Sequence, residues 1–370
     1  MRYYRSRFYS ALQLFQNYEY PEPFHVTAKN YFKSSKKFGS KDRKAISELC
    51  YTYLRTGLMF KDISIQEGLL LSGLYLEWDD LSDWNKLSTE LQYTHEVDLR
   101  SQKMYLVQLG YKPKYYPDEF LMPEFNEYLS PRNISFRPKN WAKDHTDTES
   151  RYLGLIGTKE ISHNAILEDT IQVQDLSSQF ICSKIEVTRK DKVWDVCSGA
   201  GGKTLNLSSR GEGKFYLSDI RPQIVSNAKN RLNAMHYEGF YATVDLATKK
   251  SSIDFGDETI SYDSFDIIIA DVPCSGSGTW FRTPEHFTRF DYSSLESYIN
   301  RQKSIVKNAF PFLKSGGKFY YLTCSIFEEE NSQIKNWMLE KFDVELKDEI
   351  AFNGIEHRSD AMYMASFIKK

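Results

Sequence analysis

The chain has 370 residues, which is more than one hydrophobic core usually supports, so we expect more than one domain. Hydrophobic residues make up 41% and charged residues 26%, which is the composition of a folded protein and excludes a disordered one. The formal net charge of −2 excludes a uniformly basic surface, so positive charge for binding a nucleic acid would have to be concentrated in one region.

Positive charge is concentrated at the start of the chain. The first 45 residues hold ten basic and three acidic side chains, an excess of seven positive charges, so the remainder carries a charge of −9. Apolar residues recur at intervals of three and four along residues 46–54, and Ser40 and Asp42 ahead of them have side chains that can cap a helix. We therefore predict a helical bundle over residues 1–128.

Three compositional features narrow the class of protein. Aromatic residues make up 15% of the chain, which large aromatic cores explain most simply, although base stacking would use the same residues. The five cysteines are widely spaced, without a CxxC pair or a Cys/His cluster of zinc-ligand spacing, so we expect reduced thiols and no metal site. The longest apolar stretch, Leu69–Leu76, is too short to span a bilayer, so we expect a soluble, cytoplasmic protein. We also expect a monomer.

The pattern changes between residues 129 and 170, where prolines interrupt a short alternating run, Ile134–Arg137, that is typical of a strand. We interpret residues 129–170 as a small α/β linker. Beyond residue 170 short apolar runs alternate with helical stretches, which predicts parallel strands in a doubly wound α/β sheet. Each predicted strand leads to polar residues at the sheet edge where such folds bind ligands, and the runs are Val193–Val196, Lys214–Ser218, Phe265–Ala270 and Lys318–Leu322.

A glycine-rich turn, DVCSGAGGKT at residues 195–204, follows the first of these strands. Glycines at such a turn permit positive φ and let the backbone approach a nucleotide closely. The P-loop pattern of NTPases needs a glycine where Cys197 stands, and the dinucleotide-binding fingerprint needs one where Thr204 stands. Both alternatives are weakened by these residues, and both stay open at this point.

Carboxylates follow three successive predicted strands. Asp219 lies 18 residues beyond Gly201, Asp245 follows the run Tyr241–Val244, and Asp271 ends the next strand. A carboxylate about twenty residues beyond the turn can accept hydrogen bonds from both hydroxyls of a ribose. The spacing therefore favours an adenosine ligand without a pyrophosphate, and the alternative is that these acids only cap the helices that follow.

Two cysteines lie in distinctive loops just past predicted strand ends. One loop is DVPCSGSGTW at residues 271–280, and the other is YLTCS at residues 321–325, with Glu330–Asn331 behind it. Together with the turn at residues 195–204, these segments resemble the three signature motifs of the Nop/Sun family of RNA cytosine-C5 methyltransferases. The resemblance covers about residues 170–370, and, more weakly, the N-terminal helices are similar to the NusB-like RNA-binding domain of bacterial Sun-type members.

The resemblance implies a class I, Rossmann-like methyltransferase domain over residues 171–370, preceded by an all-α domain, with residues 129–170 as a linker or RNA-recognition segment. It implies S-adenosyl-L-methionine as the cofactor, with Asp219 and Asp245 on the adenosine side and Asp271 nearer the reacting end. The turn that would hold this cofactor consists of Cys197, Ser198, Gly199, Ala200, Gly201, Gly202 and Lys203.

The resemblance also assigns different tasks to the two cysteines. Cys324 would be the nucleophile, and Cys274 would help release the product. This division suits the chemistry, because carbon 5 of cytosine is a poor nucleophile until a thiolate adds to carbon 6 and makes the ring enamine-like. Asp271 would share or donate a proton at N3 of the base, and Lys203 would favour the thiolate of Cys324.

The expected product is 5-methylcytosine in RNA, with ribosomal RNA as the expected substrate and tRNA as the alternative. A second alternative is a non-catalytic RNA-binding factor in ribosome assembly. Two sites depart from the family pattern, because Phe281 precedes a single Arg282 where a basic pair is usual, and Ser332 stands where a further acid is often found. Neither departure touches the cysteines or Asp271, so we expect them to affect the choice of substrate.

Overall fold

The computed structural model describes residues 4–20, 22–35, 37–56, 64–75, 136–138, 171–209, 211, 213–280, 283–352 and 359–370. These residues fall into two compact units. The first unit holds the described residues up to 75 together with a later segment, 280–292. The second unit holds the described residues of 136–279 and 293–370.

The first unit is helical. Its helices are α1 (Tyr4–Gln16), α2 (Phe24–Ser34), α3 (Ser40–Thr56), α4 (Ile65–Tyr75) and, from the later segment, α14 (Pro284–Arg289), which contacts α3. Phe8, Phe24 and Leu49 are fully buried in its core together with the thiol of Cys50. Because the apolar residues of each helix recur with the helical period, they gather on one face and form this core.

Two details differ from the sequence patterns. Ser40 is the first residue of α3, and Asp42, in its first turn, accepts a hydrogen bond of 2.8 Å from Arg7. The peptide N–H of Phe24 donates to the carboxylate of Glu285, at 3.1 Å, across 261 residues of sequence. The helical pattern was therefore informative about the first unit, but the contribution of the segment 280–292 to it was not predicted. The remainder of residues 1–128 lies outside the described residues.

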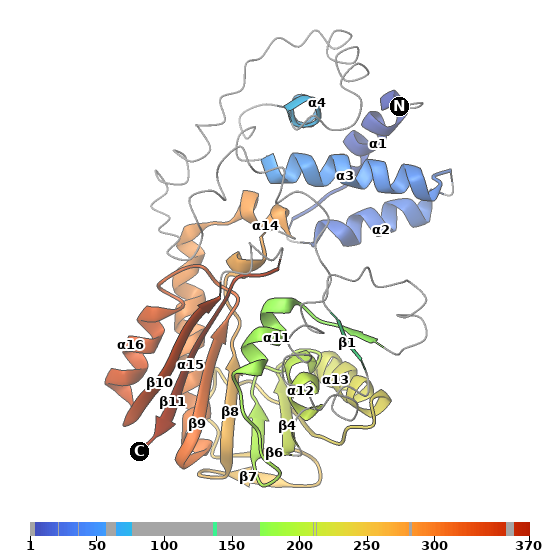
Figure 1. Ribbon diagram of the computed structural model, residues 1–370. Helices are drawn as coiled ribbons and strands as arrows, with labels where there is room; N and C mark the ends of the chain where they lie inside the picture. The colour runs from blue at the N-terminus through green and yellow to red at the C-terminus, as the bar shows by residue number, and fades with distance from the viewer. Residues whose placement is uncertain are drawn as a thin grey trace. The chain divides into compact units, whose positions relative to one another are not determined.

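The second unit contains a seven-stranded sheet in the order β10-β11-β9-β8-β3-β4-β5 (Figure 1). Its strands are β3 (Lys192–Asp195), β4 (Lys214–Asp219), β5 (Phe240–Thr243), β8 (Phe265–Asp271), β9 (Leu313–Thr323), β10 (Val344–Phe352) and β11 (Met362–Lys369). The five strands from β9 to β5 are parallel, while β11 is antiparallel to both β9 and β10. The parallel strands therefore bring their carboxyl ends to one edge of the sheet.

Helices cover both faces of this sheet (Figure 1). On one face lie α11 (Leu176–Ser183), α12 (Gly202–Ser208) and α13 (Pro222–Ala234), and on the other lie α15 (Leu295–Ala309) and α16 (Ser332–Lys341). Successive strand residues point to opposite faces, so Val193 packs with the first helices while its neighbour Trp194 packs with the second. Strands that are buried on both faces read as continuous apolar runs, which is why the sequence revealed them.

Among the described residues, the largest fully buried side chains are aromatic, which agrees with the expected use of aromatic residues in cores. Trp194 stacks on Phe265 with ring centroids 5.1 Å apart, and Tyr216 stacks on Phe240 at 4.6 Å. Trp194 and Phe265 are fully buried, so these rings are not available for base stacking. Large apolar area removed from water, with favourable ring geometry, stabilises the centre of the sheet.

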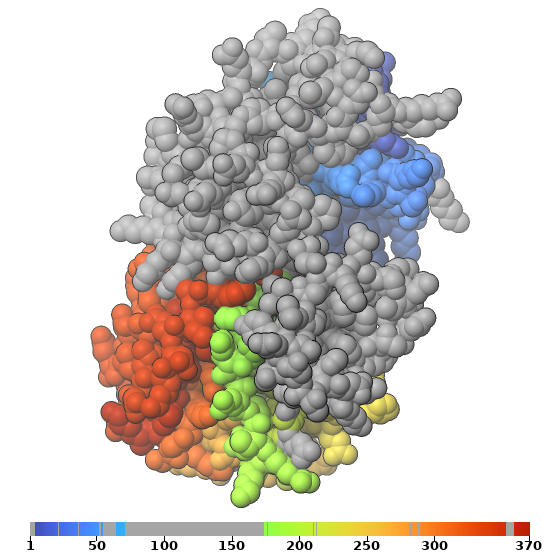
Figure 2. Space-filling model, viewed as in Figure 1, coloured from blue at the N-terminus to red at the C-terminus, as the bar shows by residue number. Residues whose placement is uncertain are grey.

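Smaller elements complete the second unit. Strand β6 (Ser252–Asp254) pairs with β7 (Thr259–Ser261), and β1 (Phe136–Pro138) pairs with β2 (Ile171–Val173). Strand β1 contains part of the run predicted as a strand, and the rest of the predicted linker lies outside the described residues. The antiparallel strands β10 and β11 were not predicted. The C-terminal part of the chain, coloured red, lies at the surface of the second unit in Figure 2. None of the helices that the structure describes is long and apolar enough to cross a membrane.

Candidate active site

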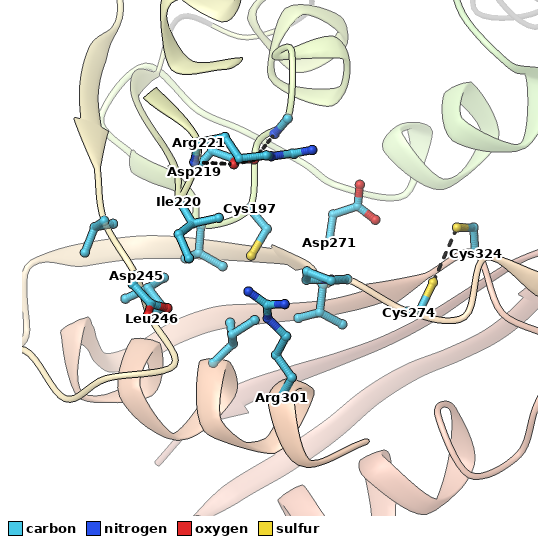
Figure 3. A pocket seen from close by; sticks show the side chains of 16 residues that line it. Cys197, Asp219, Ile220, Arg221, Asp245, Leu246, Asp271, Cys274, Arg301 and Cys324 are labelled. Atoms are coloured by element: carbon cyan, nitrogen blue, oxygen red, sulfur yellow. Dashed lines mark hydrogen bonds and ion pairs between the residues drawn. The ribbon is translucent and has the colours of Figure 1, made fainter. Parts of the chain in front are cut away.

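A cavity of about 500 Å³ lies at the carboxyl ends of the parallel strands (Figure 3). Its wall includes Cys197, Gly199, Asp219, Asp245, Asp271, Cys274 and Cys324, all of which were predicted as site residues. The wall also includes Ile220, Arg221, Leu246, Arg301 and Ile305, which were not predicted. The strand order places the predicted residues together because their strands end at the same edge of the sheet.

The glycine-rich turn borders this cavity through backbone with positive φ. Gly201 has φ of 73°, and a Cβ there would lie 2.9 Å from the side chain of Leu232, so only glycine fits. Gly199 has φ of 53°, and nothing lies within 4 Å of the position that its Cβ would take. Gly199 lines the cavity and has open space beside it, so a nucleoside can approach the backbone there. The side-chain amide of Gln174 stabilises the turn, because it donates a hydrogen bond of 3.1 Å to the carbonyl of Gly202.

Asp195 ends β3 beneath this turn and is 2% exposed. The hydroxyl of Thr204 donates a hydrogen bond of 2.7 Å to Oδ2 of Asp195. Oδ1 of Asp195 receives no hydrogen bond from the described residues. Burial raises the pKa of Asp195 to about 7, although the bond from Thr204 acts in the opposite direction. A carboxyl group in this position therefore opposes folding when it is ionised.

Asp195→Asn is expected to gain stability relative to the wild type as the pH rises. The pKa of Asp195 is about 3.8 in the unfolded chain and about 7 when folded, so the folded wild-type protein binds the extra proton and loses stability between these values. The difference between the two pKa values corresponds to a loss of about 4 kcal/mol in the free energy of unfolding of the wild type, as an upper bound. Urea denaturation of both proteins at pH 4.5, 6 and 8 measures it, and a difference that does not change with pH would contradict the assignment.

Asp219 ends β4 on the side of the cavity predicted for adenosine, and all its lone-pair sites are in use. Arg221 donates from its backbone N–H and its guanidinium to Asp219 at 2.8 to 3.0 Å, and the N–H of Gly199 donates at 3.2 Å. Burial opposes ionisation, but these hydrogen bonds outweigh it and lower the pKa of Asp219. A ribose hydroxyl would therefore have to displace one of the bonds from Arg221.

Arg221→Ala is expected to bind S-adenosylhomocysteine about two- to fivefold more tightly than the wild type, because an exposed ion pair contributes at most about 1 kcal/mol and would no longer compete for Asp219. The Arg221 side chain is 62% exposed, so its loss leaves no cavity. Isothermal titration calorimetry measures the change, and Asp219→Ala, which should weaken binding, is the matched control. Weaker binding by Arg221→Ala would show that the guanidinium itself contacts the ligand.

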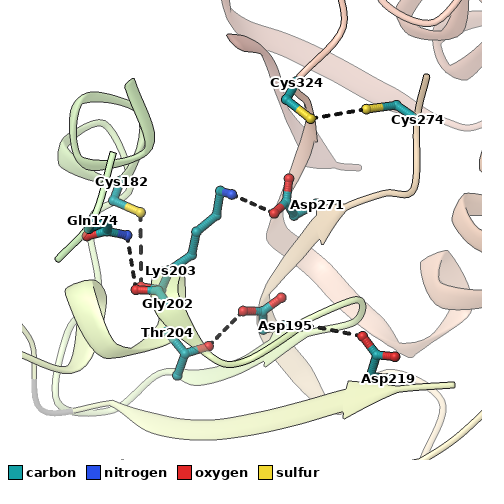
Figure 4. A network of polar contacts seen from close by, with 11 residues as sticks. Gln174, Cys182, Asp195, Gly202, Lys203, Thr204, Asp219, Asp271, Cys274 and Cys324 are labelled. Carbon is teal, nitrogen blue, oxygen red and sulfur yellow. Dashed lines mark hydrogen bonds and ion pairs between the residues drawn. The ribbon is translucent and has the colours of Figure 1, made fainter. Parts of the chain in front are cut away.

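Asp271 ends β8 and forms an ion pair with Lys203, whose Nζ lies 2.5 Å from the aspartate Oδ2 (Figure 4). Burial would lower the pKa of Lys203, but the charge of Asp271 outweighs it and raises that pKa above its ordinary value. A thiolate at Cys324 would act on Lys203 in the same direction. That Lys203 favours this thiolate stays a prediction, and Asp271 already holds the same ammonium.

The two loop cysteines meet at the end of the cavity near Asp271 (Figures 3 and 4). Their sulfur atoms are 3.4 Å apart, although the residues are 50 positions apart in sequence, and both thiols are free. Cys197 also lines the cavity, but burial and the nearby carboxylates raise the pKa of its thiol well above the ordinary value. Cys197 is thus held as a thiol, and Cys182 is buried in the core. The two thiols in contact with each other at the cavity are those of Cys274 and Cys324.

A buried carboxylate ties the two cysteine loops together. Glu330 is fully buried and accepts hydrogen bonds from the N–H of Ser275 at 2.9 Å, from the Ser275 hydroxyl at 2.6 Å, from Gln302 at 2.9 Å, and from the Ser325 hydroxyl. Ser275 follows Cys274 and Ser325 follows Cys324, so one side chain fixes both loops. The sequence offered Glu330 only through the family pattern, and Gln302 not at all.

The missed cavity residues differ in how they could have been found. Ile220 and Leu246 directly follow Asp219 and Asp245, so a search for apolar neighbours of the strand-end acids would have found them. Arg301 projects from α15 toward Cys197, and no motif marks it (Figure 3). Five of the predicted turn residues do not line the cavity and belong to the turn behind it. They are Ser198, Ala200, Gly201, Gly202 and Lys203. Phe281 and Arg282 lie outside the described residues.

Comparison with known proteins places this fold and site in a family. A family model described as 16S rRNA methyltransferase RsmB/F matches residues 183–367. Ribosomal RNA small subunit methyltransferase B of Proteus mirabilis is 31% identical over 167 residues, which cover 45% of this chain and 38% of that protein. Methyltransferase F of Vibrio cholerae is 26% identical over 256 residues, covering 66% of this chain and 50% of that protein. The chain thus matches half or less of the length of each relative.

A solved structure supports the fold independently. The crystal structure of PH0851 aligns with a TM-score of 0.70 and 18% sequence identity, covering 97% of each chain. The sheet, the glycine-rich turn and the strand-end acids are those of a Rossmann-like, S-adenosylmethionine-dependent methyltransferase, so the predicted fold class and cofactor are confirmed. Within this class, the chain belongs to the RsmB/F family, as the resemblance predicted. Among the described residues, no group of three or more His, Cys, Asp or Glu side chains is placed to hold a metal ion.

Proposed function

We propose that the protein methylates carbon 5 of cytosine in ribosomal RNA of the small subunit, through a covalent adduct with Cys324. The observation that carries this proposal is the 3.4 Å separation of the Cys274 and Cys324 sulfur atoms at one end of a cavity whose other end carries Asp219 and Asp245 (Figure 3). A single catalytic thiol would not need a second thiol in contact with it, whereas an adduct that must be formed and then resolved needs two groups.

The residues around the cavity suit S-adenosylmethionine. The turn at Gly199 leaves room for the cofactor beside the backbone, while Asp219 and Asp245 would bind the adenosine part, with Ile220 and Leu246 against the adenine. When bound, S-adenosylmethionine supplies a methyl group on a positively charged sulfur. Asp271 lies between these residues and the two cysteines (Figure 3), which supports its assignment to the reacting end of the cofactor.

The chain's own groups would act on the cytosine in a defined order. The Cys324 thiolate forms a bond to carbon 6, and the electron pair of the C5=C6 bond moves toward carbon 5, which becomes nucleophilic. Negative charge that spreads to N3 is met by the Lys203–Asp271 pair, which would share or donate a proton there. Lys203 and Asp271 thereby stabilise the charge that develops during the addition.

The adduct must then be resolved. After methylation, carbon 5 still carries its proton, and removal of that proton restores the C5=C6 bond while the bond to the Cys324 sulfur breaks. Cys274 is the thiol within 3.4 Å of Cys324, so we assign it to this step, in which it assists proton removal and expulsion of the Cys324 thiolate. The thiolate leaves as a stable anion beside the ammonium of Lys203.

The central test is direct. The purified protein is incubated with S-adenosylmethionine carrying a labelled methyl group and with unmodified small-subunit rRNA or tRNA, and the modified nucleoside is identified by mass spectrometry. We expect 5-methylcytosine in the rRNA. Label in tRNA alone would support the alternative substrate, and binding of rRNA without any label would favour an assembly factor that does not catalyse methylation.

We further propose that the helical region, residues 1–128, binds the RNA, with residues 129–170 as a connecting or RNA-recognition segment and residues 171–370 as the methyltransferase domain. Exposed basic side chains on helices α1 to α3 and on the segment between α2 and α3 support this assignment, and they are Arg5, Lys29, Lys33, Lys37, Lys41, Arg43 and Lys44. They provide positive charge for phosphate contacts that the acidic remainder of the chain does not supply.

Replacing Lys29, Lys33 and Lys37 together by Gln is expected to weaken RNA binding. Each lost phosphate contact reduces the slope of log affinity against log salt by about 0.7 to 0.9, so the slope should fall by up to about 2 to 3. Binding of S-adenosylhomocysteine should stay unchanged, because these lysines belong to the first unit. Filter binding between 50 and 300 mM salt measures the slope, and an unchanged slope would remove these lysines from the RNA interface.

A further inference from the structure

The two sulfur atoms share one contact, so the contact itself does not determine which cysteine becomes the thiolate. The difference must come from the charged and titratable groups around the pair. These groups are Lys203 from α12, Asp271 from the end of β8, Arg301 from α15, Tyr321 from β9 and Glu330 from the turn before α16. Lys203 is bound by Asp271. Glu330 accepts two hydrogen bonds from Ser275, beside Cys274, and one from the hydroxyl of Ser325, beside Cys324.

Glu330 is the buried carboxyl group at the centre of this network. It has no exposed surface, and four donor groups from three residues satisfy its two oxygens, while its own carbonyl accepts from the Tyr321 hydroxyl at 2.7 Å. One of those donors is the N–H of Ser275, the residue that follows Cys274, so the carboxyl group is bound to the loop that carries this thiol.

We propose that Glu330 is the positioning residue that selects the nucleophile, because its buried charge keeps Cys274 protonated and leaves Cys324 as the thiolate of the pair. The proposal rests on the function proposed above. In this arrangement the Cys274 S–H donates toward the Cys324 sulfur, and Lys203 attracts the negative charge on Cys324. Formation of the adduct consumes the negative charge of Cys324 in the new C–S bond, which removes one of the two charges that oppose ionisation of Cys274, so Cys274 can give up its proton and then accept the one from carbon 5.

The electrostatics of Cys274 agree with the geometry. Its contact with Cys324, then burial, and then the charges of Cys324 and Glu330 raise the pKa of the Cys274 thiol well above its ordinary value. A like charge within about 4 to 6 Å typically shifts a pKa by about one unit or more, which is a tenfold change in the thiolate fraction. Loss of the Glu330 charge should therefore make Cys274 about tenfold more reactive.

The experiment is competitive alkylation of the free full-length protein, without RNA. A limiting amount of iodoacetamide is added between pH 6.5 and 9, and the labelled fractions of Cys274 and Cys324 are quantified by peptide mass spectrometry. In the wild type we expect Cys324 to react at least about tenfold faster than Cys274. In Glu330→Gln, which keeps the shape and several hydrogen bonds, the Cys274 rate should rise about tenfold, so the preference is largely lost.

A matched variant separates charge from position. Ser275→Ala removes one hydroxyl donor to Glu330 but leaves the carboxylate charged and bound by Gln302 and Ser325. Its Cys324 preference should stay within about twofold of the wild type. An equal loss of preference in both variants, or an unchanged preference in a folded Glu330→Gln protein, would overturn the proposal. Folding is checked by circular dichroism and by binding of S-adenosylhomocysteine.

A second measurement covers the case in which Glu330→Gln does not fold. In Cys324→Ala the thiol of Cys274 has no sulfur partner, and Glu330 remains. We expect the alkylation rate of Cys274 to reach half of its maximum at a pH clearly above about 8.5, the pKa of a free thiol. A midpoint at that pH would overturn the proposal. None of these measurements involves methyl transfer, so failure of the proposed function, seen as methylation by Cys324→Ala, is distinguishable from failure of this inference.

Discussion

Cys324→Ala is expected to lose methyl transfer by at least about a thousandfold and to form no adduct, whereas Cys274→Ala should accumulate a covalent protein–RNA complex. The reason is the order of the two steps. The sulfur of Cys324 makes the bond to the base, and Cys274, 3.4 Å away, is needed only to break it. Denaturing gel electrophoresis with labelled RNA separates the adduct from free RNA.

The control for this pair is Cys182→Ala. Cys182 is buried in the core, and its side chain is not in the cavity wall, so the variant should lose some stability but keep activity without an adduct. An equal loss of activity in both loop variants with no adduct in either would contradict the two-cysteine mechanism. An adduct in Cys324→Ala would reverse the assignment of the nucleophile.

Gly278→Ala is expected to destabilise the second unit by about 2 to 4 kcal/mol and to lower methyl transfer strongly. The N–H of Gly278 donates to the carbonyl of Cys324 at 2.8 Å, and its carbonyl accepts from Ala361 at 2.9 Å. An added Cβ would overlap the carbonyl oxygen of Ala361 and would lie 2.8 Å from that of Cys324. The backbone that carries the nucleophile would have to move.

Gly256→Ala is the matched control for this prediction. Gly256 has φ of 89°, so alanine is strained there, but nothing lies within 4 Å of its Cβ position. We expect a cost of about 1 kcal/mol and unchanged kcat. Thermal unfolding and single-turnover methylation of both variants measure the two effects. Equal destabilisation by the two substitutions would show that backbone strain, and not contact with the Cys324 segment, explains the result.

The sequence revealed the parallel part of the sheet because its strands are buried on both faces and read as apolar runs. The runs that begin at Lys214, Phe265 and Lys318 lie within observed strands, and the run Val193–Val196 extends one residue past the end of β3. The antiparallel strands β10 and β11 escaped prediction, and for the edge strand β10 the reason is that it is half exposed, which weakens its pattern. The segment 280–292 also escaped, since its place in the helical unit depends on contacts such as that between Phe24 and Glu285.

By itself, the sequence determined which chemical groups stand at the strand ends, because the order of polar residues after apolar runs is a one-dimensional property. It identified the turn at residues 195–204, the acids and the two cysteines without any coordinates. Only the tertiary structure decided how these groups interact. The sulfur contact, the Lys203–Asp271 pair and the network of Glu330 join residues 5 to 68 positions apart, and such contacts depend on packing and side-chain direction that local patterns do not specify.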